Sequence, residues 1–342
     1  MTGDSSAERR RLQMADIARL AGVSVSTVSR ALSGSTLVNG ETRARVQQLA
    51  QSLNYSVNLG AQNLRLQKNL TIGVVVPYDA QSRQHISDPF FLSIVGSIAD
   101  SLTDHGYDML LSRVDSERLD AASQLYDSGK VLGVIIIGQW RHHDQLNQLA
   151  ARNVPLVVWG AELAQQLYCS VGGDNVDGGQ QATAHLLQSG RKKIAFLGDR
   201  ALPEVWLRRE GYLRAHQAAK IEPVDALEIK VPFEPEAARL AIEQLCDSAL
   251  EFDGVVACSD LIAIQLMQAL RQRGKSVPAD VSVVGYDDMA LAAFCEPPLT
   301  TVHQPVLQAG AELVDALLRL LQGDPATPRT LPVNVVVRAS AP

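Results

Sequence analysis

Hydrophobic residues follow two different periods along the chain, and the change falls near residue 69. Before that point apolar side chains recur every three or four residues, which is the period of short amphipathic helices. Beyond it, short runs rich in β-branched residues alternate with longer amphipathic stretches, the pattern of buried parallel strands joined by helices. The 342 residues are therefore predicted to form a small all-α unit followed by a large α/β unit.

Three short helices are predicted in the first unit. The first covers residues 14–21 and ends at Gly22, which permits a tight turn. The second begins after Ser24 and the third after Asn39, because both residue types are good N-caps. A helix, a glycine turn and a second helix within about twenty residues indicate a helix-turn-helix, whose second helix enters the DNA major groove.

The second predicted helix carries side chains that suit base recognition. Val25, Ser26 and Arg30 are expected to point away from the helical core. Arginine can bridge two acceptors of guanine, and valine can contact a thymine methyl group. Short hydroxyl and amide groups nearby are candidates for phosphate contacts: Ser24, Thr27, Ser29, Asn39 and Thr42. The alternative from periodicity alone is a small helical bundle whose polar groups face water.

The α/β pattern fills the rest of the chain. Strands are predicted at 71–76, 108–111, 134–137, 155–158, 193–197, 254–257 and 281–284. Helices are predicted at 91–104, 178–187, 204–218, 236–246 and 261–273. These strands and helices are too many for a single sheet of ordinary size, so two similar lobes with a cleft between them are expected. Ligands of such folds bind at the carboxyl ends of the strands.

The charge distribution separates the two units. Residues 1–68 contain nine basic and four acidic residues, whereas the remainder has a net charge of −11 within a whole-chain value of −6. A basic first unit beside an acidic second unit indicates that the first unit binds a polyanion. The beginning of the chain has no apolar signal segment, and no apolar run has the length of a membrane span. We therefore expect a cytoplasmic, nucleoid-associated protein without membrane contact.

Motifs of catalysis and of cofactor or metal binding are missing from the sequence. It contains no GxGxxG, GxxxxGK[ST], GxSxG or HExxH pattern. Cys169, Cys246, Cys258 and Cys295 lie far apart, which favours reduced thiols over a metal or redox site. The adjacent pair His142–His143 is interpreted as surface. No catalytic residue, cofactor or metal is predicted.

The first unit resembles the DNA-binding headpiece of the LacI/GalR family. The resemblance rests on DIARLAGVSVSTVSRALSG and on the following VNGETRARVQQLAQSLNY. It implies that Val25, Ser26 and Arg30 read bases, although the Val25–Ser26 pair differs from that of the family's best-known member. Residues 58–65, NLGAQNLR, are similar to the family's hinge helix, which implies that Leu64 wedges into the minor groove and kinks the duplex. The alternative for Leu64 is an ordinary apolar linker residue.

The second unit resembles the effector domain of the same family, which is similar to periplasmic binding proteins. The resemblance is carried by DPFF, GDN, RREGY, FEPEA, CSDLIAIQ, SVVGYDD and PPLTTVHQ. It implies two doubly wound parallel-sheet lobes between which the chain crosses three times. The expected divisions are a disordered arm at 1–12, a headpiece at 13–57, a hinge and linker at 58–69, and an effector-binding and dimerisation domain at 70–342. Within that domain we expect an N-lobe at 71–171 plus 305–322, and a C-lobe at 172–304 plus 323–342.

The same resemblance nominates residues of the effector site. Arg208 and Asp260 are expected as polar anchors, because a carboxylate accepts from sugar hydroxyls and an arginine donates to others. Phe233 and Phe90 are expected as apolar walls. For Asp260 the alternative role is to cap the helix that follows it.

Three tryptophans add an observation that is independent of the family. Trp140 and Trp159 each follow an apolar strand directly, and Trp206 lies two residues before Arg208. Indole faces stack on the apolar face of a sugar ring, so this grouping favours a carbohydrate larger than a monosaccharide. The alternative is packing at the interface between the lobes.

The sequence therefore predicts a homodimeric repressor that binds double-stranded operator DNA and is released by a small sugar, such as a disaccharide or other glycoside. No leucine heptads that would make a tetramer follow the apolar run 333–337. The alternatives are a corepressor-dependent regulator that senses a purine or a sugar phosphate, and a solute-binding receptor.

Overall fold

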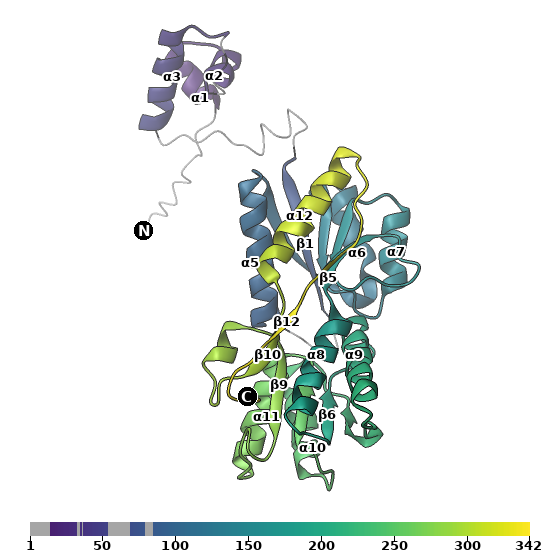
Figure 1. Ribbon diagram of the computed structural model, residues 1–342. Helices are drawn as coiled ribbons and strands as arrows, with labels where there is room; N and C mark the ends of the chain where they lie inside the picture. Colours follow the sequence, from purple (N-terminus) through teal and green to yellow (C-terminus); the bar gives the residue numbers. More distant parts are fainter. Residues whose placement is uncertain (1–13, 33–34, 36, 54–68, 79–84) are drawn as a thin grey trace, which may run out of the picture. The chain divides into compact units, whose positions relative to one another are not determined.

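The computed structural model describes residues 14–32, 35, 37–53, 69–78 and 85–342. The chain divides into two compact units, Met1–Asn69 and Leu70–Pro342 (Figure 1). The expected arm at 1–12, the hinge at 58–65 and Leu64 lie outside the described residues. None of the described helices is both long and apolar enough to cross a membrane.

The first unit contains the three expected helices, α1 (Met14–Ala21), α2 (Val25–Leu32) and α3 (Gly40–Ser52). Their apolar stripes meet in a small core in which Ile17, Val28 and Val46 are fully buried. Between α1 and α2 Gly22 adopts a φ of 63°, a conformation that residues with a β-carbon rarely adopt. The helix-turn-helix that the pattern predicts is therefore present.

One six-stranded sheet forms the N-lobe, in the order β11-β5-β4-β3-β1-β2 with all neighbours parallel. Its strands are β1 (Thr71–Tyr78), β2 (Asp108–Asp115), β3 (Val134–Ile137), β4 (Leu156–Trp159), β5 (Cys169–Gly173) and β11 (Arg329–Leu331). Helices α5 (Pro89–Asp104) and α12 (Val306–Gln322) cover one face, and α6 (Asp120–Asp127) and α7 (His143–Ala151) cover the other (Figure 1).

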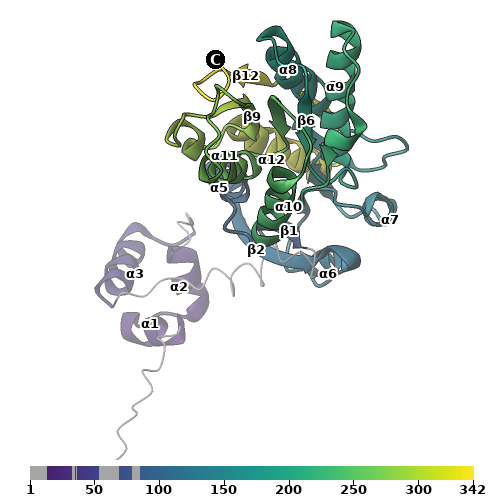
Figure 2. The ribbon, with the colours of Figure 1, turned by 90° about the horizontal axis from the view of Figure 1, so that it is seen from below.

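A second six-stranded sheet forms the C-lobe, in the order β12-β10-β9-β8-β6-β7. Its strands are β6 (Ile194–Leu197), β7 (Glu228–Ile229), β8 (Gly254–Ala257), β9 (Ser282–Asp287), β10 (Thr300–His303) and β12 (Asn334–Val336), of which β12 pairs antiparallel. Helices α8 (Asn175–Gln188) and α9 (Pro203–Ala219) lie on one face, and α10 (Pro235–Asp247) and α11 (Asp260–Gln272) on the other (Figure 2). Short 3-10 turns are η1 (Ser116–Arg118), η2 (Asp225–Leu227) and η3 (Ala290–Ala293). Two mainly parallel, doubly covered sheets confirm the predicted fold class.

The chain passes between the lobes after β5, after β10 and after β11. The three crossing segments pack together at Gly173, where a β-carbon would lie 3.1 Å from Gln304 Oε1 and 3.0 Å from Val333. One expected boundary is corrected here. Residues 323–342 were assigned to the C-lobe, but β11 pairs with β5 and so belongs to the N-lobe sheet. The three residues of β11 are of mixed polarity and give no periodic signal, so the sequence did not predict this strand. Because β11 belongs to the N-lobe sheet, the third crossing falls near residue 332.

Candidate ligand cavity and nucleic-acid interface

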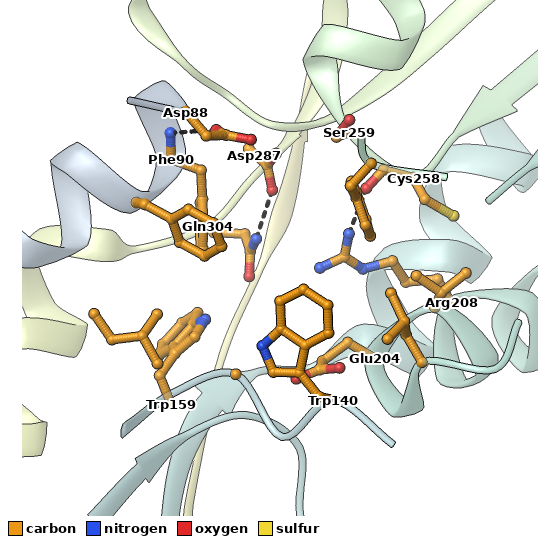
Figure 3. A pocket seen from close by; sticks show the side chains of 16 residues that line it. Asp88, Phe90, Trp140, Trp159, Glu204, Arg208, Cys258, Ser259, Asp287 and Gln304 are labelled. Carbon is orange, nitrogen blue, oxygen red and sulfur yellow. Dashed lines mark hydrogen bonds between the residues drawn. The ribbon is translucent and has the colours of Figure 1, made fainter. Parts of the chain in front are cut away.

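A cavity lies between the lobes at the carboxyl ends of their parallel strands (Figure 3). Trp159 is the last residue of β4, Asp287 is the last residue of β9, and Ser259 follows β8. The empty volume is about 710 Å³ with the solvent at the mouth included. A concave site with mostly apolar walls and a few convergent polar groups is typical of small-molecule binding.

Aromatic side chains from both lobes form the apolar walls. Phe90, Trp140 and Trp159 come from the N-lobe and Phe233 from the C-lobe, and all four line the cavity as predicted. The rings of Phe90 and Trp159 are tilted by 44° with their centroids 6.2 Å apart. Flat apolar faces of this kind can pack against the carbon face of a sugar ring.

Trp206 does not line this cavity, which corrects its assignment as a contact. Its indole is 50% exposed and lies 5.3 Å from the Arg209 guanidinium on the outer side of α9. Glu204, Val205 and Arg208 turn toward the cavity instead. Because a helix rotates by about 100° per residue, proximity to Arg208 in the sequence did not place Trp206 on the same face.

Among the residues that the structure describes, Arg208 is the single cation that lines the cavity. Its Nε donates to Asn175 Oδ1 at 2.9 Å and its Nη1 to the Cys258 carbonyl at 2.6 Å. The guanidinium also lies 3.6 Å from the centre of the Tyr286 ring. Helix α9 comes close to α8 at Gly179, where a β-carbon would overlap the Arg208 backbone. These contacts fix the side chain of Arg208, and its guanidinium points into the cavity (Figure 3).

Asp260 lies behind the cavity rather than in its wall, so its assignment as a direct anchor is corrected. The residue is fully buried, and its carboxylate accepts from the Thr301 hydroxyl and from Met289 N at 2.8 Å. Burial raises the pKa of Asp260 to about 7. The capping role also belongs to its neighbour, because Ser259 Oγ accepts from Ile262 N at the start of α11.

Besides Ser259, four polar residues that the sequence reasoning did not nominate line the cavity: Asp88, Glu204, Asp287 and Gln304. Three of them stand within or beside the motifs DPFF, SVVGYDD and PPLTTVHQ, so the signal was present but was not resolved to single residues. Glu204 had no such signal. Gln304 belongs to a crossing segment, and its Nε2 donates to Asp287 Oδ1 at 2.8 Å.

Carboxyl groups outnumber basic groups among the described residues that line the cavity. Burial raises the pKa of Asp287 well above its usual value, and nearby Arg208 partly opposes this effect. Burial likewise raises the pKa of Glu204, against hydrogen bonds from its own amide and that of Gln139. Three carboxyl groups and one guanidinium, set among aromatic rings, can accept from and donate to several hydroxyl groups. The described residues contain no cluster of His, Cys, Asp or Glu that could hold a metal ion.

Helix α2 of the first unit carries the three residues that are predicted to read bases. Val25 is 38% exposed, and Ser26 and Arg30 are exposed, whereas Val28 and Ala31 are buried against α1 and α3. The base-reading candidates therefore share the outer face of the helix.

The candidate phosphate contacts lie at or near helix starts. Ser24 Oγ accepts from Thr27 N at 3.2 Å, and Asn39 Oδ1 accepts from Thr42 N at 2.9 Å. Helix N-termini attract phosphate groups through their free amides and dipole. Thr27, Ser29 and Thr42 are half-buried, so these hydroxyls present only part of their surface.

Comparison with known proteins agrees with this geometry. Residues 13–58 match the model of bacterial regulatory proteins of the lacI family, and residues 183–341 match a periplasmic binding protein-like domain. The chain is 33% identical to the HTH-type transcriptional regulator CelR of Thermobifida fusca, over 97% of this chain and 99% of that protein. The chain belongs to the lacI family.

This lacI-family regulator is also 31% identical to the ribose operon repressor of Haemophilus influenzae, over 93% of this chain and 94% of that protein. Among solved structures it is similar to the lac repressor dimer bound to operator and the anti-inducer ONPF, with a TM-score of 0.86, 28% identity, and 97% and 99% of the two chains covered. It is also similar to a CelR–cellobiose complex, with a TM-score of 0.72, 30% identity, and 96% and 100% covered. The resemblance found in the sequence is confirmed: the chain is a DNA-binding transcriptional regulator.

Proposed function

We propose that this regulator is a homodimeric repressor whose operator affinity is lowered when a neutral sugar binds between its lobes. The observation that carries the proposal is the cavity itself, which the described residues line with five aromatic side chains, one fixed guanidinium and three carboxyl groups. Phe90, Trp140, Trp159 and Phe233 would contact the sugar rings, and Arg208, Glu204 and Asp287 would bind hydroxyl groups. The related CelR was solved with cellobiose, which makes a disaccharide the first ligand to test.

On the DNA side, Val25, Ser26 and Arg30 are proposed to read bases from the exposed face of α2. The proposed phosphate contacts are Ser24, Thr27, Ser29, Asn39 and Thr42. Leu64, outside the described residues, is proposed as the minor-groove wedge of a hinge at 58–69. Two copies would bind symmetric half-sites, since a twofold dimer requires a near-palindromic operator. We place this activity in the cytoplasm, at the nucleoid.

The experiment is thermal melting of the intact chain with cellobiose, glucose, ribose, a purine base and glucose 6-phosphate. A ligand that binds only the folded protein raises the melting temperature, and at 100 times its Kd it adds about 2.7 kcal/mol. We expect a shift with one of the neutral sugars. A shift with the purine or the sugar phosphate alone would overturn the sugar proposal and leave the regulator assignment unchanged.

A further inference from the structure

The turn that follows β3, residues 138–141, has an unusual backbone. Gly138 has a φ of 95° and Trp140 a φ of 49°, which is in the left-handed region that favours glycine. A β-carbon on Gly138 would lie 3.3 Å from Trp140 Nε1, so the glycine leaves room for the indole to fold back. A tryptophan persists in such a conformation where its surroundings hold it there.

The N-lobe holds this turn through Gln139, whose side chain is fully buried. Its Nε2 donates to the Ala161 carbonyl at 2.6 Å and to the Tyr168 hydroxyl at 3.0 Å. Its Oε1 accepts from Ala161 N at 3.0 Å. The amide of Gln139 is therefore satisfied within the N-lobe, and the next two residues are presented at the edge of the lobe.

The C-lobe contacts the same turn at two points. Arg141 Nη2 lies 2.5 Å from Asp199 Oδ2, and the Asp199 side chain is only 9% exposed. The backbone amide of Gln139 faces the carboxyl group of Glu204 and lowers its pKa, which opposes the larger effect of burial. Asp199 and Glu204 stand on the segment between β6 and the first turn of α9, so one segment of the C-lobe holds one turn of the N-lobe.

The Arg141–Asp199 pair differs in location from the other ion pairs of the second unit. Among ion pairs between residues that the structure describes, it is the one that joins the two lobes. Exposed pairs contribute little to stability, but a buried carboxylate that loses its partner is strongly disfavoured. Lys230, at 3.7 Å from Asp199, supplies a second and more distant positive charge from within the C-lobe.

We propose that the Arg141–Asp199 ion pair, with the contact between the Gln139 amide and the Glu204 carboxyl group beside it, forms a clasp that holds the two lobes together. The clasp is separate from the three crossing segments at Gly173, Gln304 and Val333. It also fixes Trp140, which lines the cavity between two residues of the clasp. A ligand that moves Trp140 must therefore alter the clasp, which couples occupancy of the cavity to the arrangement of the lobes.

The test is hydrogen–deuterium exchange of the full chain without any ligand, with Arg141→Gln and Asp199→Asn as the variants. Asparagine keeps the Oδ1 atom that accepts from Ala201 N, so the second substitution spares the local turn. We expect amides in peptides covering 138–143 and 199–205 to exchange about tenfold faster in either variant, because the clasp opens locally. The matched control is Arg152→Gln, which breaks a half-exposed pair with Asp127 inside the N-lobe and should leave both peptides unchanged.

Two further measurements test the origin of the faster exchange. The first asks whether it comes from loss of the ion pair, and the second asks whether the arrangement of the lobes also changes. The double variant should exchange no faster than either single one, because both remove the same interaction; additive effects would contradict the pairing. Small-angle scattering should show a larger radius of gyration for both single variants than for the control. Unchanged exchange or unchanged scattering would overturn the clasp. Because no ligand is used, a failure of the sugar proposal would not affect this result.

Discussion

Arg208 shows how contacts within the protein can preorganise a single side chain for ligand binding. Two hydrogen bonds and the Tyr286 ring hold its guanidinium, so little rotamer freedom remains to be lost on binding. The residue is 7% exposed, and charged hydrogen bonds in such surroundings are stronger than those at the surface. Its role as an anchor can be tested by substitution.

Arg208→Gln should weaken the binding of the sugar that the melting experiment selects by about 1.5–3 kcal/mol, the typical loss for a hydrogen bond to a charged group. Calorimetric titration of the full chain measures the change. Arg214→Gln, which removes an exposed ion pair with Glu210 on the same helix, is the control and should bind as the wild type does. Equal affinities of the wild type and the Arg208 variant would remove Arg208 from the site.

Asp260 should make stability depend on pH in a predictable direction. Burial raises its pKa from 3.8 to about 7, whereas in the unfolded chain the pKa is near its ordinary value of about 3.9. The folded state therefore holds the proton more tightly, so unfolding between these values releases it. Through Asp260 the free energy of unfolding falls as pH rises from about 4 to about 7 and is constant above that window.

Urea unfolding of wild type and Asp260→Asn across this pH range checks the assignment. The fall in unfolding free energy should be smaller in the variant, because asparagine has no proton to release. A remaining slope is expected, since burial also raises the pKa values of Asp287 and Glu204. Parallel profiles for the two proteins would show that Asp260 does not titrate in this range.

Single residues were also where sequence reasoning reached its limit. Trp140 and Trp159 could be placed because a residue that ends a parallel strand lies at a known edge of the sheet. Trp206 and Asp260 sit on helices, where a shift of one or two residues turns the side chain to another face. Sequence position indicated that Asp260 lies near the site, but only the packing shows that Ser259 and Asp287 face the cavity and Asp260 does not.

At the scale of elements, helix α2 presents a reading face that a single substitution can test. Arg30→Ala should reduce affinity for the best operator, chosen by selection from a random DNA library, by about 1–3 kcal/mol and relax base choice at one position of each half-site. Repeating the selection with the variant measures that relaxation. Arg19→Ala, on the exposed side of α1, should leave base choice unchanged. An equal loss of affinity on all sequences would make Arg30 a phosphate contact instead.

Strong patterns predicted the elements well, and weak patterns failed for identifiable reasons. The β-branched runs at 134–137 and 254–257 correspond to β3 and β8 without any shift of their ends. Strand β5 was not predicted because Cys169–Gly173 contains two glycines and a serine. Strand β11 holds three residues, and its place in the N-lobe depends on pairing with a strand more than 150 residues earlier, a contact that no local pattern encodes.

At the scale of the molecule, some residues that line the cavity also take part in, or lie next to, the contacts between the lobes. Gln304 contacts a crossing segment at Gly173 and also binds Asp287 in the cavity wall. Trp140 lines the same cavity next to the ion pair that joins the lobes. A ligand in the cavity therefore contacts residues of both the crossing segments and the proposed clasp. It can favour one arrangement of the lobes over another if its contacts differ between the two.

Any effect of such a ligand on DNA binding must be matched by an equal effect of DNA on ligand binding, and both effects can be measured. If the sugar lowers operator affinity by a given factor, the operator must lower sugar affinity by the same factor, because both describe one coupling free energy. We expect a factor between about 5 and 150, the usual range for allosteric proteins.

Fluorescence anisotropy of a labelled operator with and without saturating sugar gives the first value, and calorimetric titration of the sugar with and without operator gives the second. Equal decreases in the two affinities would establish that the sugar is an inducer. Equal increases would establish a corepressor and reverse the sign of the proposed regulation. A factor of one in both directions would mean that the sugar binds without controlling the headpiece.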